Sequence, residues 1–169
     1  MWLAAIVYAF DHGGPRMAGF ASIGLYVPGA LAAPYIGRVA DGGRPNAAFV
    51  TSLATMSFGL TFATLLAWRT APAIAVVAGV GLASATTSLL RPASVVVIPG
   101  HVRSARELTL ANLHLALADN VSALAGPLLA SAMLAAGGAT AVFLASAVAT
   151  AFGAIIAAPL ALRERPLGG

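Results

Sequence analysis

The stretch from residue 139 to residue 162, ATAVFLASAVATAFGAIIAAPLAL, contains no ionisable side chain. An α-helix rises about 1.5 Å per residue, so roughly 20 apolar residues cross the hydrocarbon core of a bilayer. This stretch is longer than that. It predicts a transmembrane helix, and the rest of the chain decides how many such helices accompany it.

Four further apolar stretches reach the same length, over residues 17–40, 47–68, 71–90 and 108–136. Residues 1–10 are also apolar but cover only about 15 Å, which predicts the outer half of a further helix. Ser104 and Glu107 fit a capping box at the start of the 108–136 helix. We therefore expect an all-α polytopic bundle forming a single transmembrane domain over residues 1–169, with a loop at 91–107.

The composition agrees with a membrane location. The chain is 60% hydrophobic and 8% charged, whereas soluble domains are about a quarter charged. Its net charge of +4 is the balance of nine basic and five acidic residues, and the basic residues are scattered, so no nucleic-acid patch is expected. Without cysteine there is no thiolate metal site, and no phosphate loop, nucleophile elbow or HExxH motif occurs. We expect no cofactor, no metal and no enzymatic activity.

The arginines predict the topology. Seven of them fall in the segments 38–45 and 91–107 and after residue 162, and only Arg16 and Arg69 fall on the other side. Short loops rich in arginine remain in the cytoplasm. We therefore expect a multi-pass cell-membrane protein with both loops and the C-terminus cytoplasmic. Residues 11–16, with two glycines and a proline, predict a turn on the outer side.

The 108–136 helix carries the most informative polar residues. Asn112, Asp119 and Gly126 lie seven residues apart and share one face. An acid within a membrane helix is costly to bury, so Asp119 is a candidate proton-relay or cation site. The alternative is a structural hydrogen bond to Asn112, Asn120 or a neighbouring hydroxyl. Pro127, directly after Gly126, predicts a kink.

Residues 37–45 read GRVADGGRP. This resembles the motif that major facilitator superfamily transporters carry after their second helix, with Gly37, Asp41 and Arg44 at matching positions and Gly42 in place of a basic residue. Residues 90–99 and 107–112 are similar to the link between helices four and five of bacterial exporters in that family. Residues 125–127 (AGP) resemble part of the helix-five motif of its drug–proton antiporters, with Ala130 and Ser131 in place of the last two glycines of that motif.

The chain thus looks like the N-terminal six-helix half of such a transporter, truncated at both ends. The resemblance implies export of a small molecule by alternating access between two halves. It also implies a cytoplasmic gating motif at Gly37, Asp41 and Arg44, with Asp119 and Asn112 facing the cavity. Expected partners are the lipid bilayer, a small-molecule substrate, and a second six-helix half or second chain. A non-transporting membrane anchor or sensor module, and an inactive fragment of a transporter gene, remain alternatives.

Overall fold

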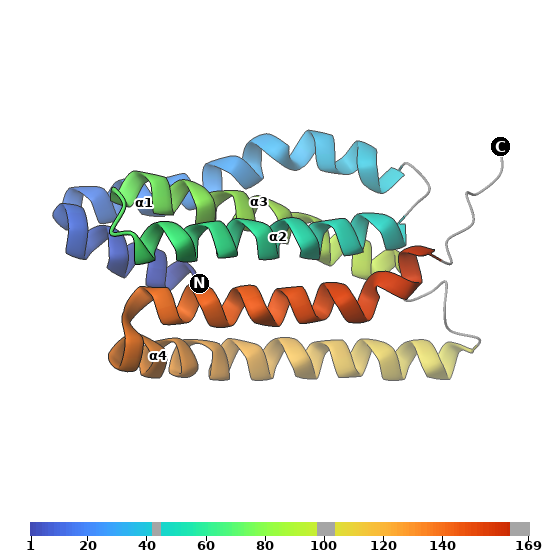
Figure 1. Ribbon diagram of the computed structural model, residues 1–169. Helices are drawn as coiled ribbons and strands as arrows, with labels where there is room; N and C mark the ends of the chain where they lie inside the picture. Colours follow the sequence, from blue (N-terminus) through green and yellow to red (C-terminus); the bar gives the residue numbers. More distant parts are fainter. Residues whose placement is uncertain (42–44, 98–103, 163–169) are drawn as a thin grey trace.

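The computed structural model describes residues 1–41, 45–97 and 104–162, with side chains described over 1–31, 46–87 and 104–162. These residues form helices joined by short turns, which confirms the all-α prediction (Figure 1). The helices are α1 (Trp2–Asp41), α2 (Pro45–Trp68), α3 (Ala73–Val97) and α4 (Ala105–Leu162).

Helices α1 and α4 each consist of two segments separated by one glycine. Gly14 (φ 70°, ψ −170°) interrupts α1, and Gly138 (φ 68°, ψ −167°) interrupts α4. This combination of angles is essentially restricted to glycine, because a Cβ atom would collide with the backbone. The chain reverses direction at both glycines (Figure 1). The described residues therefore make six helical segments from four helices.

Two predicted boundaries differ from the structure. The turn expected over residues 11–16 is reduced to Gly14, and Pro15 starts the next segment at once. The proline ring fixes φ near the value of a first helical residue. The loop expected over residues 91–107 is too long, since α3 continues to Val97. A proline at position 92 removes one backbone donor but does not by itself end a membrane helix.

The start of α4 carries the expected cap. Ser104 Oγ accepts a hydrogen bond from the backbone N–H of Glu107 at 3.2 Å. This bond satisfies one of the amide groups that the first turn of a helix leaves without an intrahelical acceptor. It is one half of the predicted capping box.

Helix α3 is the centre of the packing. It lies against both α1 and α2, whereas α1 and α2 scarcely touch each other and α4 packs mainly against α2. Small residues permit the close approach: a Cβ atom added at Gly59 of α2 would lie 3.0 Å from the carbonyl oxygen of Gly79 in α3. Where α1 crosses α3, a Cβ atom at Gly81 would lie 3.3 Å from the carbonyl oxygen of Gly24.

The two segments of α4 differ in burial. Its buried residues are Val142, Phe143, Ala147 and Ala157, all of which follow Gly138. Phe143 is fully buried and belongs to the main core, together with Val76 and Val80 of α3. The segment before Gly138 contributes no buried residue and forms an outer layer of the bundle.

The apolar surface of the bundle fits a membrane environment. Among the described residues, Asn46–Trp68 and Ala105–Leu162 are long and apolar enough to span a bilayer, while Ala73–Thr87 is apolar but shorter. Large apolar side chains such as Phe20, Leu124 and Leu128 are about 70% exposed. Such surface is stable when it faces lipid and unfavourable when it faces water.

The two ends of the bundle have different contents. Gly14, Gly138 and the α2–α3 turn at residues 69–72 lie at one end, which we name the Gly14 end (Figure 1). The C-terminal ends of α1 and α3 and the start of α4 lie at the opposite end (Figure 1). An even number of helical segments separates Gly14 from Gly138. Because each segment carries the chain from one end of the bundle to the other, both glycines lie at the same end.

Replacing Gly138 with alanine should destabilise the bundle by on the order of 1–3 kcal/mol, because alanine is strained at this combination of φ and ψ. Thermal unfolding of the purified protein in detergent measures the effect. Gly19→Ala is the matched control, since Gly19 is helical and a Cβ atom there meets nothing within 4 Å. Equal unfolding temperatures for the two variants would contradict the prediction.

Candidate functional site

A pocket of about 430 Å³ lies between the two segments of α1 and α3. We name it the Trp2 pocket. One wall is aromatic and another carries hydroxyl groups, and none of its lining residues is charged. The lining residues are Trp2, Leu25, Tyr26, Gly29, Ala30, Ser84 and Thr87.

Hydrogen bonds and ring contacts fix the polar wall of this pocket. The indole Nε1–H of Trp2 donates to Ser84 Oγ at 3.0 Å, and Ser84 in turn donates to the carbonyl oxygen of Val80. The rings of Trp2 and Tyr26 meet edge to face with centroids 5.2 Å apart. Thr87 Oγ1 donates to the carbonyl oxygen of Ser84 at 2.7 Å, which leaves its lone pairs as acceptors.

The Trp2 pocket lies near the middle of the bundle. Leu25 and Ala30 follow Gly14 by 11 and 16 residues, and Ser84 and Thr87 follow the start of α3 by 11 and 14 residues. At about 1.5 Å per residue, these positions are roughly 16–24 Å from the Gly14 end. The pocket therefore lies about halfway along the second segment of α1 and along α3.

A second cavity, also of about 430 Å³, adjoins the first through Trp2. We name it the Pro127 cavity; its lining residues are Met1, Trp2, Leu3, Gly126, Pro127 and Ala130. Helix α4 keeps helical backbone angles through Gly126 and Pro127, and its one non-helical residue is Gly138. The kink expected at Pro127 stays a prediction. What the structure adds is that Gly126 and Pro127 face the start of α1.

Asn112 and Asp119 are exposed on the outer segment of α4. Neither lines the Trp2 pocket or the Pro127 cavity. Asp119 is seven residues before Gly126, which places it about 10 Å farther from the Gly14 end. The structure therefore brings Gly126 and Pro127 to the Pro127 cavity and leaves Asp119 on the same helix, toward the opposite end.

Comparison with family models decides the relationship. The model of the Major Facilitator Superfamily matches residues 1–169. The chain belongs to the Major Facilitator Superfamily. No curated protein and no solved structure matches it significantly. Members of this superfamily are membrane transporters and not enzymes, so the chain is a membrane protein of a transporter family.

The superfamily motif after the second membrane segment spans the connection between α1 and α2. Gly37 and Asp41 lie in the last turns of α1, and Asp41 is its final residue. Arg44 and the side chain of Asp41 lie outside the described part of the chain. Their gating role stays a prediction.

The described part of this superfamily member holds no group of three or more His, Cys, Asp or Glu side chains able to bind a metal ion. His12 instead stacks on Tyr8 with ring centroids 4.0 Å apart, and its Nδ1 lies 2.9 Å from the carbonyl oxygen of the same tyrosine. Tyr8 donates to the carbonyl oxygen of Ala71 at 2.9 Å, which joins α1 to the α2–α3 turn.

Sequence reasoning missed the residues that line the Trp2 pocket. Trp2, Tyr26 and Ser84 are far apart in the chain, and each is unremarkable as a lone polar or aromatic residue in an apolar helix. The one available signal was the run of hydroxyl residues from Thr86 to Ser88 near the end of the predicted 71–90 helix. Only the fold of α1 back on itself brings Trp2 and Tyr26 together beside α3.

Replacing Ser84 with alanine should lower the stability by about 0.6–1 kcal/mol, because the indole N–H of Trp2 then loses its acceptor inside the bundle. Thermal unfolding in detergent measures this loss. Ser131→Ala is the control, since the exposed Ser131 hydroxyl bonds only within its own helix, to the carbonyl oxygen of Pro127. The assignment fails if Ser84→Ala unfolds at the same temperature as Ser131→Ala.

Proposed function

We propose that this chain forms one six-helix half of a carrier that exports a small molecule by alternating access. The observation that carries the proposal is the Trp2 pocket, an aromatic and hydroxyl-lined space about halfway along α3 in a member of a transporter family. Carriers of this kind bind substrate near the bilayer midplane, where two repeats meet. Export in particular is suggested by the resemblance of residues 125–127 to the motif of drug–proton antiporters.

The lining of the Trp2 pocket suggests the chemistry of the substrate. The rings of Trp2 and Tyr26 favour a flat apolar molecule, and the hydroxyl of Thr87 offers a hydrogen-bond acceptor. No charged residue lines this pocket, so a strongly charged group would not be compensated there. We propose an apolar, aromatic substrate that carries a hydrogen-bond donor.

Alternating access requires a second unit that moves against this one. The outer segment of α4 exposes Asn112 and Asp119 and has no buried residue. Polar groups on a membrane helix face protein or a water-filled cavity rather than lipid. We propose that a second six-helix unit, in the same polypeptide or in another chain, covers this segment. Gly37, Asp41 and Arg44 would then gate the cytoplasmic mouth between the two units.

Asp119 would serve as the titrating or cation-binding group on that interface. Its position, about 10 Å from Gly126 toward the opposite end, places it between the Pro127 cavity and the proposed cytoplasmic face. A carboxylate at this depth exchanges protons with the cytoplasm more readily than one at the midplane. Binding or release of a proton there would favour one of the two access states.

Replacing Asp119 with asparagine in the complete carrier should abolish or strongly reduce transport while membrane levels stay unchanged, because the amide cannot titrate. Uptake of candidate aromatic compounds into everted membrane vesicles measures transport. Glu107→Gln is the matched control, since it removes a carboxylate from the first turn of the same helix. Unchanged transport in Asp119→Asn would rule out this role.

The orientation of the bundle is a separate proposal. Arg16 and Arg69 lie toward the Gly14 end, whereas Arg106 is in the first turn of α4 at the opposite end, together with the backbone positions of Arg38 and Arg91. Following the positive-inside rule, we propose that the opposite end is cytoplasmic in a plasma membrane.

The absence of cysteine allows a direct test of this orientation. In intact cells, Asp11→Cys should react with a membrane-impermeant maleimide, whereas Ala105→Cys should react only after the membrane is permeabilised. Both positions are exposed, so accessibility to water on one side decides the labelling. The reverse pattern would invert the proposed topology.

A further inference from the structure

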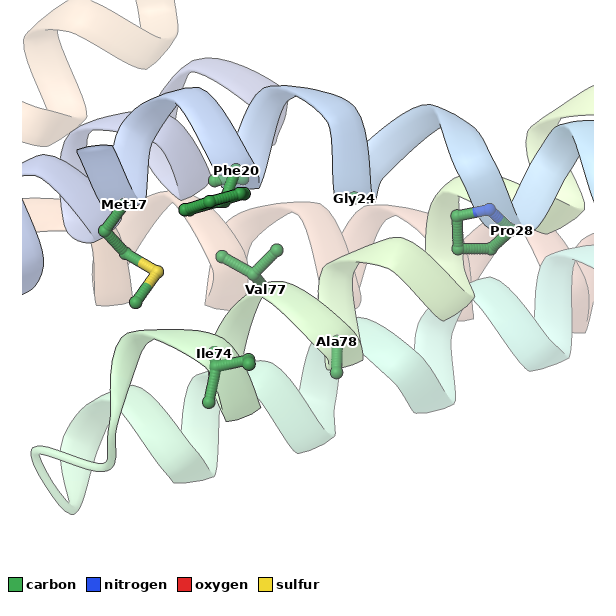
Figure 2. A pocket seen from close by; sticks show the side chains of 8 residues that line it. Met17, Phe20, Gly24, Pro28, Ile74, Val77 and Ala78 are labelled. Carbon is green, nitrogen blue, oxygen red and sulfur yellow. The ribbon is translucent and has the colours of Figure 1, made fainter. Parts of the chain in front are cut away.

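An apolar groove lies between the second segment of α1 and the first turns of α3, separate from the Trp2 pocket. Its volume is about 680 Å³, and we name it the α1–α3 groove. Figure 2 shows side chains from both helices directed into the space between them, with Met17 and Phe20 on α1 and Val77 on α3. Phe20 and Ile74, which form its rims, are 69% and 68% exposed. The groove is therefore open at the surface of the bundle.

Small residues form the floor of this groove and close its inner end. A Cβ atom added at Gly24 would lie 3.5 Å from Val77 Cγ1, so the two helices touch there. One turn farther, a Cβ atom at Gly81 would lie 3.4 Å from the ring of Pro28. The helices are thus in contact at Pro28, and the groove extends from that contact toward the Gly14 end.

The length of the groove matches one lipid leaflet. Along α1 it runs from Met17 to Pro28, which is about 16 Å at 1.5 Å per residue. Half of the hydrocarbon core is about 15 Å. A single acyl chain that enters from the Gly14 end would therefore lie along the whole groove.

Two arginines flank the mouth of the groove. Arg16 directly precedes Met17, and Arg69 lies in the turn that leads into α3, five residues before Ile74. Both side chains are exposed, and neither forms an ion pair with a described residue. Asp11 is the one described carboxylate near this end, so the positive charge dominates. The other seven arginines lie in segments predicted to be cytoplasmic, whereas these two lie on the opposite side.

An apolar slot with a cationic mouth is complementary to an anionic phospholipid. We propose that the α1–α3 groove binds one acyl chain of an anionic phospholipid whose phosphate interacts with Arg16 and Arg69. The guanidinium groups hydrogen-bond the phosphate oxygens, and the chain covers apolar surface that the two helices leave open. This site does not depend on the transported substrate.

Native mass spectrometry of the purified polypeptide tests the proposal. The protein is incubated in detergent with dioleoyl phosphatidylglycerol and dioleoyl phosphatidylcholine, which share the same acyl chains. One phosphatidylglycerol should be retained in preference to phosphatidylcholine. Glycerol phosphate, which has the head group without the chains, should not displace it. Equal retention of the two lipids, or displacement by glycerol phosphate, would overturn the proposal.

Matched variants locate the bound lipid. Arg16→Gln and Arg69→Gln should each reduce the preference for phosphatidylglycerol about fivefold, whereas Arg106→Gln at the opposite end should not change it. Ala78→Leu fills the groove from an exposed lining position and should remove binding, and Ala149→Leu, exposed on α4, should not. Thermal unfolding confirms that the variants are folded. Binding that persists in Ala78→Leu, or that falls equally in the controls, contradicts this location.

Discussion

Close contact between helices is the constraint on which the rest of this structure depends. In a bilayer, apolar side chains gain little by leaving lipid, so helices associate through packing and hydrogen bonds. Helix α3 achieves this on two sides at once, with Gly79 against α2 and Gly81 against α1. Because α3 holds both neighbours at short range, the Trp2 pocket and the α1–α3 groove form on one helix, on either side of the contact between Gly81 and Gly24.

Hydrogen bonds supplement this packing at two places. Trp2 bonds to Ser84 in the middle of the bundle, and Tyr8 bonds to the backbone of Ala71 near the Gly14 end. Both bonds join the first segment of α1 to another part of the chain. They act together with Ala4, Ala5, Tyr8 and Ala9, which this segment contributes to the main core. The indole of Trp2 is thereby fixed as a wall between the Trp2 pocket and the Pro127 cavity.

The helical architecture was accessible from the sequence because length and apolarity alone decide whether a segment can cross a bilayer. The stretch 139–162 and the motif at Gly37, Asp41 and Arg44 were enough to predict the fold class and the superfamily, and the family match confirms both. The points where the chain reverses direction were harder to predict, since a single residue, Gly14, replaces the expected six-residue turn. The Trp2 pocket could not be predicted from the sequence, because Trp2, Tyr26 and Ser84 become neighbours only through the packing of α1 on α3. Asp119 was identifiable as an acid in an apolar helix, but its distance from the cavities was not.

The outer segment of α4 has a mechanical consequence. Residues 105–137 extend about 50 Å, well beyond the roughly 30 Å of hydrocarbon, and bury none of their side chains in the bundle. A helix longer than the membrane is thick accommodates the mismatch by tilting or by projecting from it. Ala130, Met133 and Leu134 pack against the main core and hold one part of this segment, so the bilayer thickness acts mainly on the part that precedes them. The lipid composition of the host membrane therefore acts on the helix that carries Asp119, Gly126 and Pro127.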